Sequence, residues 1–177
     1  MTTATEAITV RPARTEDAAR LAAIWNTEAL TTLNTTDTET RDLAAQRAWL
    51  ASHSDAYPVI VAVADGDVAG YAALMPYRAK PAFRQTVEDS VYVHTAWRGH
   101  GVGRLLLAHL VETATAVGHH SVLARIMAEN VVSRRLHEAL GFRLVGVEEA
   151  VAFKLGRWLD VAVYQRRLTP ARRSDAP

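Results

Sequence analysis

Residues 91–104 read VYVHTAWRGHGVGR, and this stretch decides the predicted fold. A β-branched run over residues 86–93 predicts a strand, and apolar residues at helical spacing predict a helix over 104–117. Three glycines stand between the two and let the backbone turn tightly. The first N–H groups of a helix have no partner within it, so this strand, loop and helix predict a phosphate site. Arg98 and Arg104 would supply full positive charges there.

Three explanations of this loop compete. A dinucleotide fingerprint needs Gly-x-Gly-x-x-Gly, but here the third glycine follows the second after one residue. A P-loop needs Gly-Lys-Ser/Thr, whereas Gly103 is followed by Arg104 and Leu105. The third explanation is a glycine-rich turn that binds no ligand. The P-loop is therefore excluded, the dinucleotide fingerprint is disfavoured, and the turn without a ligand stays open.

Outside this stretch, composition bounds the class of protein. The chain has 177 residues, is 49% hydrophobic and carries a formal charge of +1. This length predicts one globular domain over residues 1–168, and the tail at 169–177 is predicted to be disordered. The near-neutral charge argues against a protein that binds nucleic acid mainly through phosphate contacts.

Other classes are excluded by what the sequence lacks. There is no cysteine, so a disulfide framework, a thiolate zinc site and a cysteine nucleophile are excluded. The longest apolar run, residues 59–64, is far shorter than the roughly 20 residues that span a bilayer. The first six residues lack the basic and apolar segments of an export signal. We therefore expect a cytoplasmic protein without a membrane partner.

Strand and helix patterns alternate along the chain. Besides the strand at 86–93, strands are predicted near 8–11, 59–64, 68–75 and 121–127 and twice more before residue 168; helices are predicted near 18–29, 40–50, 104–117 and 131–140. Asp65-Gly66 predicts a tight hairpin turn. The order predicts a mixed α/β (α+β) domain.

Two motifs resemble those of one enzyme superfamily. Residues 98–103, RGHGVG, resemble the pyrophosphate loop Arg/Gln-x-x-Gly-x-Gly/Ala of the GCN5-related N-acetyltransferases, abbreviated GNAT. Residues 130–142, NVVSRRLHEALGF, are similar to that superfamily's second motif. Residues 86–93 (TVEDSVYV), 136–142 (LHEALGF) and 156–161 (GRWLDV) are similar to its phosphinothricin and methionine sulfoximine N-acetyltransferase branch.

The resemblance extends over about residues 7–168 and carries expectations for the whole protein. It implies the GNAT fold, with a mixed central sheet splayed after the fourth strand and helices on both faces. It implies acetyl-CoA as cosubstrate, with no metal, and a small amino acid or analogue that is acetylated on its α-amine. It also implies a homodimer.

Two side chains are candidates for proton transfer. Glu88 lies in a strand with Thr86, Val87, Val91 and Val93, where an unpaired carboxylate is costly to bury. It is predicted to be the general base that deprotonates the amine, although it could instead pair with Arg78 or Arg84 at a sheet edge. Asp89, its neighbour, is predicted to be structural. His137 stands where most of the superfamily has tyrosine and this branch has histidine. The resemblance implies that it protonates the CoA thiolate, and ordinary packing is the alternative.

The remaining cofactor contacts follow from the same resemblance. It implies that backbone N–H groups near residues 91–93 stabilise the oxyanion. Asn130 and Ser133 are predicted to cap their helix and to hold the CoA arm. The full predicted set is Val91, Tyr92, Val93, Arg98, Gly99, His100, Gly101, Val102, Gly103, Arg104, Asn130 and Ser133.

Substrate recognition is predicted from charge and aromatic side chains. A free carboxylate or phosphinate calls for fixed positive charge. Strand alternation puts Ser90 on the same face as Glu88, and two aromatic residues could wall the pocket. The predicted substrate residues are Arg78, Lys80, Phe83, Arg84, Ser90 and Trp158.

Two other functions remain open. A GNAT enzyme acting on a protein N-terminus or a polyamine would have an open acidic groove, and the basic cluster at residues 78–84 argues against it. A non-catalytic acetyl-CoA-binding module would lack Glu88 and His137, and both are present.

Overall fold

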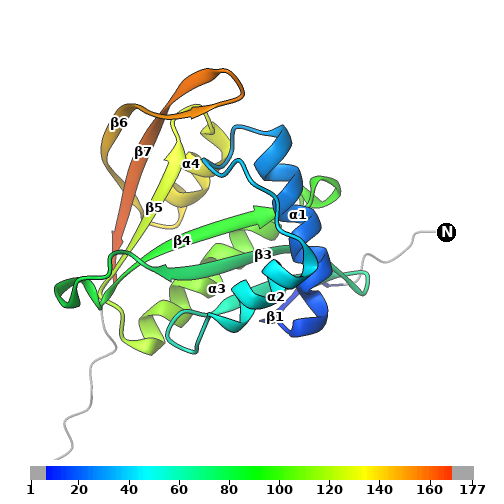
Figure 1. Cartoon of the computed structure of the whole chain (residues 1–177). Helices are drawn as coiled ribbons and strands as arrows, with labels where there is room; N and C mark the ends of the chain where they lie inside the picture. The colour runs from blue at the N-terminus through cyan, green and yellow to red at the C-terminus, as the bar shows by residue number, and fades with distance from the viewer. Residues whose placement is uncertain (1–6, 169–177) are drawn as a thin grey trace, which may run out of the picture.

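A mixed sheet of seven strands, in the order β1-β2-β3-β4-β5-β7-β6, is the frame of the molecule (Figure 1). The computed structural model describes residues 7–168, and the tail predicted at 169–177 lies outside them. The strands are β1 (Thr9–Pro12), β2 (Val59–Ala64), β3 (Asp67–Pro76), β4 (Thr86–Val93), β5 (Ser121–Met127), β6 (Arg143–Lys154) and β7 (Arg157–Arg167). Every neighbouring pair is antiparallel except β4 and β5, which run parallel.

Helices cover both faces of this sheet, as predicted. They are α1 (Ala18–Thr31), α2 (Leu43–Ala51), α3 (Val102–Val117) and α4 (Val131–Ala139), with single 3-10 turns η1 (Thr15–Asp17), η2 (Pro81–Phe83) and η3 (Thr95–Trp97). Apolar residues of α1 and α2 pack on one face of β2 and β3, and those of α3 pack on the other. With both faces covered, β3 is buried along nearly all its length, which explains its almost continuous apolar sequence.

The predicted hairpin joins β2 to β3. Asp65 has a φ of 49° and Gly66 a φ of 78°, and two consecutive residues with positive φ are typical of the tight turn that Asp-Gly favours. The turn brings two apolar strands into antiparallel register at the centre of the sheet. The predicted boundaries of β2, β4 and β5 are confirmed.

Strands β4 and β5 pair over only three residues each and then part. Thr86 to Glu88 pair with Ser121 to Leu123, whereas β4 continues to Val93. The edge of the later half of β4 that faces β5 therefore has no partner strand. This is the predicted splay after the fourth strand, and Figure 1 shows the two strands diverging.

The register of β4 against β3 decides which way its side chains point. Pairing runs without a shift from Pro76↔Val87 to Gly70↔Val93. Glu88, Ser90 and Tyr92 therefore share one face, as predicted. The Tyr92 ring lies 5.5 Å from the Trp25 ring of α1, so this is the face that α1 covers.

We predict that Gly70→Ala destabilises the fold, because a Cβ atom at this position would lie 2.7 Å from the Tyr92 carbonyl oxygen and 3.2 Å from Leu106 Cδ1. Overpacking of this kind costs about 1–3 kcal/mol. A chain of this size loses roughly 2–4 °C of Tm per kcal/mol, measurable by thermal unfolding followed by circular dichroism. Gly146→Ala is the control, since nothing lies within 4 Å of its Cβ position. Equal Tm values for the two variants would contradict this prediction.

Candidate active site

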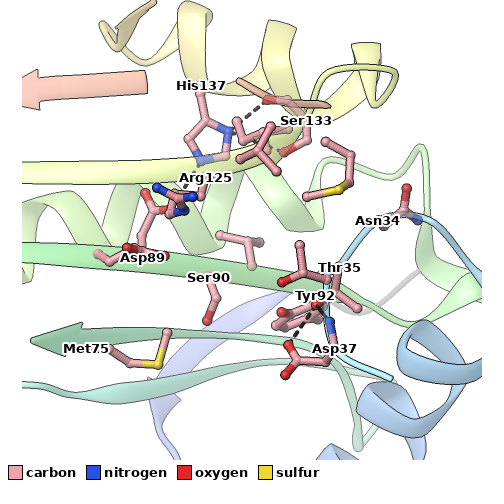
Figure 2. A pocket seen from close by; sticks show the side chains of 16 residues that line it. Asn34, Thr35, Asp37, Met75, Asp89, Ser90, Tyr92, Arg125, Ser133 and His137 are labelled. Carbon is pink, nitrogen blue, oxygen red and sulfur yellow. Dashed lines mark hydrogen bonds and ion pairs between the residues drawn. The ribbon is translucent and has the colours of Figure 1, made fainter. Parts of the chain in front are cut away.

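A cavity of about 150 Å³ opens where β4 and β5 part (Figure 2). Because the gap passes through the sheet, side chains from both faces of β4 line it. The polar residues that matter for its chemistry are Glu88, Asp89, Ser90, Arg125, Ser133 and His137. Val91 and Tyr92 line it too, so the structure brings six of the predicted site residues together.

Glu88 reaches this cavity from β4 as a half-buried carboxylate. Burial raises the pKa of Glu88; Arg125 opposes this shift, and Asp89 and Glu148 add to it. The ion pairs found within residues 7–168 do not involve Glu88, so pairing with Arg78 or Arg84 is not what the structure shows. A carboxylate with a raised pKa is a stronger base, which suits proton abstraction near neutral pH.

His137 reaches the cavity from the other face of the sheet and pairs with Asp89. Its Nδ1 lies 2.7 Å from the Ser133 carbonyl oxygen, and its Nε2 lies 3.4 Å from Asp89 Oδ1. Burial alone would lower the pKa of His137, but Asp89 and the Ser133 carbonyl outweigh it, so the pKa is raised. The imidazole therefore keeps its proton to higher pH than a free histidine. The sequence did not predict this partner, because Asp89 was assigned only a structural role.

The start of α4 is fixed by Asn130. Its Oδ1 accepts a hydrogen bond from the Ser133 backbone N–H at 3.0 Å, which confirms the predicted cap. Its Nδ2 donates to Asn34 Oδ1 at 3.1 Å. Asn34, Asn130 and Trp158 line a neighbouring hollow of about 250 Å³. Trp158 thus lies beside the first cavity rather than in it.

The glycine loop leads into α3 with a free helix end. Gly99 and Gly101 have φ values of 80° and 81°, which favour glycine, and no side chain caps the first N–H groups of the helix. The helix begins at Val102, earlier than predicted, so Gly103 belongs to its first turn and not to the loop. A Cβ atom on Gly103 would lie 3.4 Å from Leu136 Cδ2, so this glycine lets α3 pack closely against α4.

The two loop arginines differ in their surroundings. Arg104 is exposed on the first turn of α3. The Arg98 guanidinium forms an ion pair with Glu28 of α1, and its Nε donates to the Val93 carbonyl oxygen at 3.3 Å. Arg98 is therefore held by the protein itself, which the loop sequence did not predict. His100 stays close by, with its Nδ1 2.9 Å from the Arg98 carbonyl oxygen.

The predicted basic cluster lies away from the cavity. Arg78, Lys80, Phe83 and Arg84 follow β3, and none of them lines either hollow. The Arg78 guanidinium lies over the Tyr77 ring at 5.0 Å. Their role in substrate binding stays a prediction.

The arginine that does line the cavity is Arg125 of β5. Its Nη1 donates to Glu148 Oε1 of β6 at 3.1 Å, and its Nη2 pairs with the other oxygen of that carboxylate. No motif of the sequence marked this residue.

The residues at the strand gap fit acetyl-CoA. The unpaired edge of β4 can receive an extended chain, the uncapped end of α3 favours a diphosphate, and Asn130 lines the neighbouring hollow. No group of three or more His, Asp or Glu side chains within residues 7–168 is placed to hold a metal ion. In the same part of the chain, no helix is both long and apolar enough to cross a membrane.

Comparison with known proteins identifies the family. Residues 21–142 match the Acetyltransferase (GNAT) family. The chain is 39% identical to the L-methionine sulfoximine/L-methionine sulfone acetyltransferase of Salmonella typhimurium, covering 96% of this chain and 99% of that protein. It is 40% identical to the phosphinothricin N-acetyltransferase of Streptomyces coelicolor, covering 93% and 98%. YncA from Salmonella typhimurium, solved with its cofactor acetyl-CoA, is 38% identical, with a TM-score of 0.89 over 97% of this chain and 100% of that one.

The chain therefore belongs to the GNAT acetyltransferase family, and the resemblance of its motifs is confirmed. It is an acetyl-CoA-dependent N-acetyltransferase.

We predict that Glu88→Gln raises Tm at pH 7. A raised pKa in the folded state means that the protonated carboxyl stabilises the fold, and this contribution is lost as pH rises through the folded pKa. At pH 7, above the ordinary pKa of glutamate, ionisation favours the unfolded state, and glutamine removes that effect. Below the ordinary pKa of glutamate, both states are protonated, so the difference in Tm should shrink towards pH 4. Thermal unfolding over this pH range checks it.

Glu112→Gln, at an exposed site on α3, is the matched control for this stability measurement. Its Tm should follow the wild type at each pH. A Glu88→Gln protein less stable than the wild type by the same amount at pH 4 and pH 7 would contradict the assignment of a costly buried charge.

Proposed function

We propose that this enzyme transfers the acetyl group of acetyl-CoA to the α-amine of a free amino acid or analogue, of the phosphinothricin or methionine sulfoximine and sulfone type. The observation that carries the proposal is the cavity that Glu88 and His137 share at the strand gap. The substrates named for the two relatives support this class of acceptor. A cytoplasmic location is part of the proposal, because the reaction consumes acetyl-CoA.

Glu88 acts on the incoming amine. An α-amine with a pKa near 8 is largely protonated at pH 7 and cannot attack a thioester in that form. Glu88 accepts the proton, directly or through water, and its raised pKa makes it a better base. Such a base contributes roughly 10²–10⁴-fold to the rate.

Other groups of the chain act on the thioester that acetyl-CoA supplies. Backbone N–H groups near residues 91–93, on the edge of β4 that has no partner strand, donate to the carbonyl oxygen as negative charge develops on it. His137 donates a proton to the departing sulfur. Asp89 and the Ser133 carbonyl raise the pKa of the imidazole and orient it for this step.

Transfer is direct, within one complex of both substrates. The chain has no cysteine to carry an acetyl group. Glu88 and His137 line one cavity but come from opposite sides of the gap, which suits an acceptor on one side and a thioester on the other.

A homodimer is part of the proposal. Apolar side chains stay exposed on β6 and around the turn into β7: Val145, Val147, Val151, Phe153 and Trp158 are 47–64% exposed. Several large apolar side chains exposed on neighbouring strands are typical of a site of association. The surface includes Trp158 of the neighbouring hollow, so a second copy would approach the substrate side. Four predicted substrate residues do not line the cavity of one chain: Arg78, Lys80, Phe83 and Arg84. They would contact the substrate only if the acceptor site extends beyond that cavity.

A protein N-terminus is the second candidate acceptor. Asp37, Glu88 and Asp89 line the cavity together with a single arginine, Arg125. Such an enzyme is expected to have an acidic groove. The excess of carboxylates in the cavity fits that expectation better than the basic cluster at residues 78–84 did. A peptide with a free N-terminus therefore belongs in the test.

We predict that the wild type releases CoA thiol from acetyl-CoA with methionine sulfone, methionine sulfoximine or phosphinothricin. Glu88→Gln should lower kcat by about 10²–10⁴-fold with little change in KM for acetyl-CoA, because only proton transfer is lost. Thiol release with these compounds, a panel of free amino acids and an alanine-terminated peptide measures it. Glu112→Gln is the control.

Turnover of the peptide alone would replace the proposed substrate class with the second candidate. No turnover with any acceptor, or full activity in Glu88→Gln, would overturn the proposed function.

We predict that Phe153→Glu converts a dimer into a monomer, because a charge would be buried in the apolar contact. Size-exclusion chromatography with light scattering measures the mass. Val117→Glu is the matched control: Val117 is 42% exposed on α3, away from this surface, and its variant should remain dimeric. A monomeric wild type would contradict the proposed homodimer.

A further inference from the structure

Glu28 of α1 is a buried carboxylate that contacts two parts of the active site. Its side chain is 4% exposed. One oxygen, Oε1, accepts from Arg98 of the glycine loop. The other, Oε2, accepts from Thr32 Oγ1 at 2.8 Å and from Asn34 Nδ2 at 3.0 Å. One carboxylate thus joins the predicted diphosphate site to the segment that follows α1.

That segment, residues 32–37, is called the acceptor loop here because four of its members line the active-site cavity. Lys154 of β6 holds it from a second side. The buried Nζ of Lys154 donates to the Thr35 carbonyl oxygen at 2.9 Å and to the Glu28 carbonyl oxygen at 3.2 Å. The acceptor loop is therefore anchored at both the side chain and the backbone of Glu28.

The charge on Glu28 makes these contacts depend on one another. A buried carboxylate is costly unless a cation and hydrogen bonds compensate it. Among the described residues, Arg98 is the cation in direct contact with its side chain. Arg98 belongs to the loop that would bind the diphosphate, so the loop that holds the cofactor also fixes the carboxylate that holds Thr32 and Asn34.

We propose that Glu28 is a positioning residue that couples acetyl-CoA binding to acceptor binding. This inference rests on the proposed function. A diphosphate bound at residues 99–103 fixes the glycine loop, which keeps Arg98 against Glu28 and the acceptor loop against the cavity. The second ligand then binds to a site that is already ordered, so each ligand raises the affinity of the protein for the other. Glu28 itself does not line the cavity, and it acts through Arg98, Thr32 and Asn34.

The test measures this coupling at equilibrium. Calorimetry gives the Kd of desulfo-CoA, which cannot react, with and without a saturating amount of the best amino acid of the thiol-release panel. In the wild type, the ratio of the Kd of desulfo-CoA without the acceptor to the Kd with it should be at least about 5, the lower end of usual coupling. In Glu28→Gln this ratio should fall close to one. The acceptor KM should rise while kcat at saturation of both substrates changes much less.

A second variant distinguishes a loss of coupling from misfolding and from loss of the Arg98–Glu28 ion pair. Thr32→Val keeps the Arg98–Glu28 pair but removes a hydroxyl that donates to Glu28 Oε2 and to the Glu28 carbonyl oxygen and accepts from the Asn34 backbone N–H. The Kd of desulfo-CoA alone should therefore stay unchanged while the ratio falls. Thr113→Val is its matched control, because Thr113 Oγ1 also donates to a carbonyl four residues earlier, in α3. Its ratio should equal that of the wild type.

A wild-type ratio of one, or a ratio kept in both Glu28→Gln and Thr32→Val, would overturn the inference. Turnover by the wild type judges the proposed function separately. If the wild type acetylates amino acids but shows no coupling, only the role of Glu28 is lost. If it acetylates none, both fall.

Discussion

The parting of β4 from β5 is the constraint on which the active site depends. Two parallel strands that stayed paired would satisfy each other's backbone groups and close the sheet. Here pairing stops at Glu88 and Leu123, so the later half of β4 keeps a free edge and a gap opens through the sheet. Residues that alternate to opposite faces of β4 can therefore serve one cavity, which an intact sheet would not permit.

Two neighbouring carboxylates in this gap have different surroundings because they point in opposite directions. Glu88 lies on the face covered by α1, is without a cationic partner in the described chain, and has a raised pKa. Asp89 points to the other face and pairs with His137, whose pKa it raises. Both shifts favour the protonated form, which is a neutral carboxyl at Glu88 and a charged imidazolium at His137. In the proposed mechanism, strand alternation thus separates the base, Glu88, from Asp89, which contacts the acid, His137.

Local sequence patterns predicted most of the fold. The site was harder to predict, because it depends on contacts between side chains that are far apart in the sequence. The Asp65-Gly66 turn and the apolar runs of β2 and β3 are signals contained within a few residues. The cap at Asn130 was predictable for the same reason. Asp89 and His137 are 48 residues apart, and Glu28 and Arg98 are 70 apart, so no spacing rule could pair them. Arg125 was missed because its place in the cavity depends on where β5 leaves β4, which no local pattern indicates.

The burial of Lys154 has a consequence for the chemistry of an enzyme that works on amines. The sequence has two lysines, Lys80 and Lys154. Lys154 is 3% exposed and its ammonium is held by two carbonyl oxygens, whereas Lys80 is exposed just before η2. Within the described chain, spontaneous modification by reactive acyl donors is therefore confined to a single lysine. The same feature leaves Lys80, at the connection between β3 and β4, as the lysine of the described chain that amine-reactive labels can modify, alongside the α-amino group.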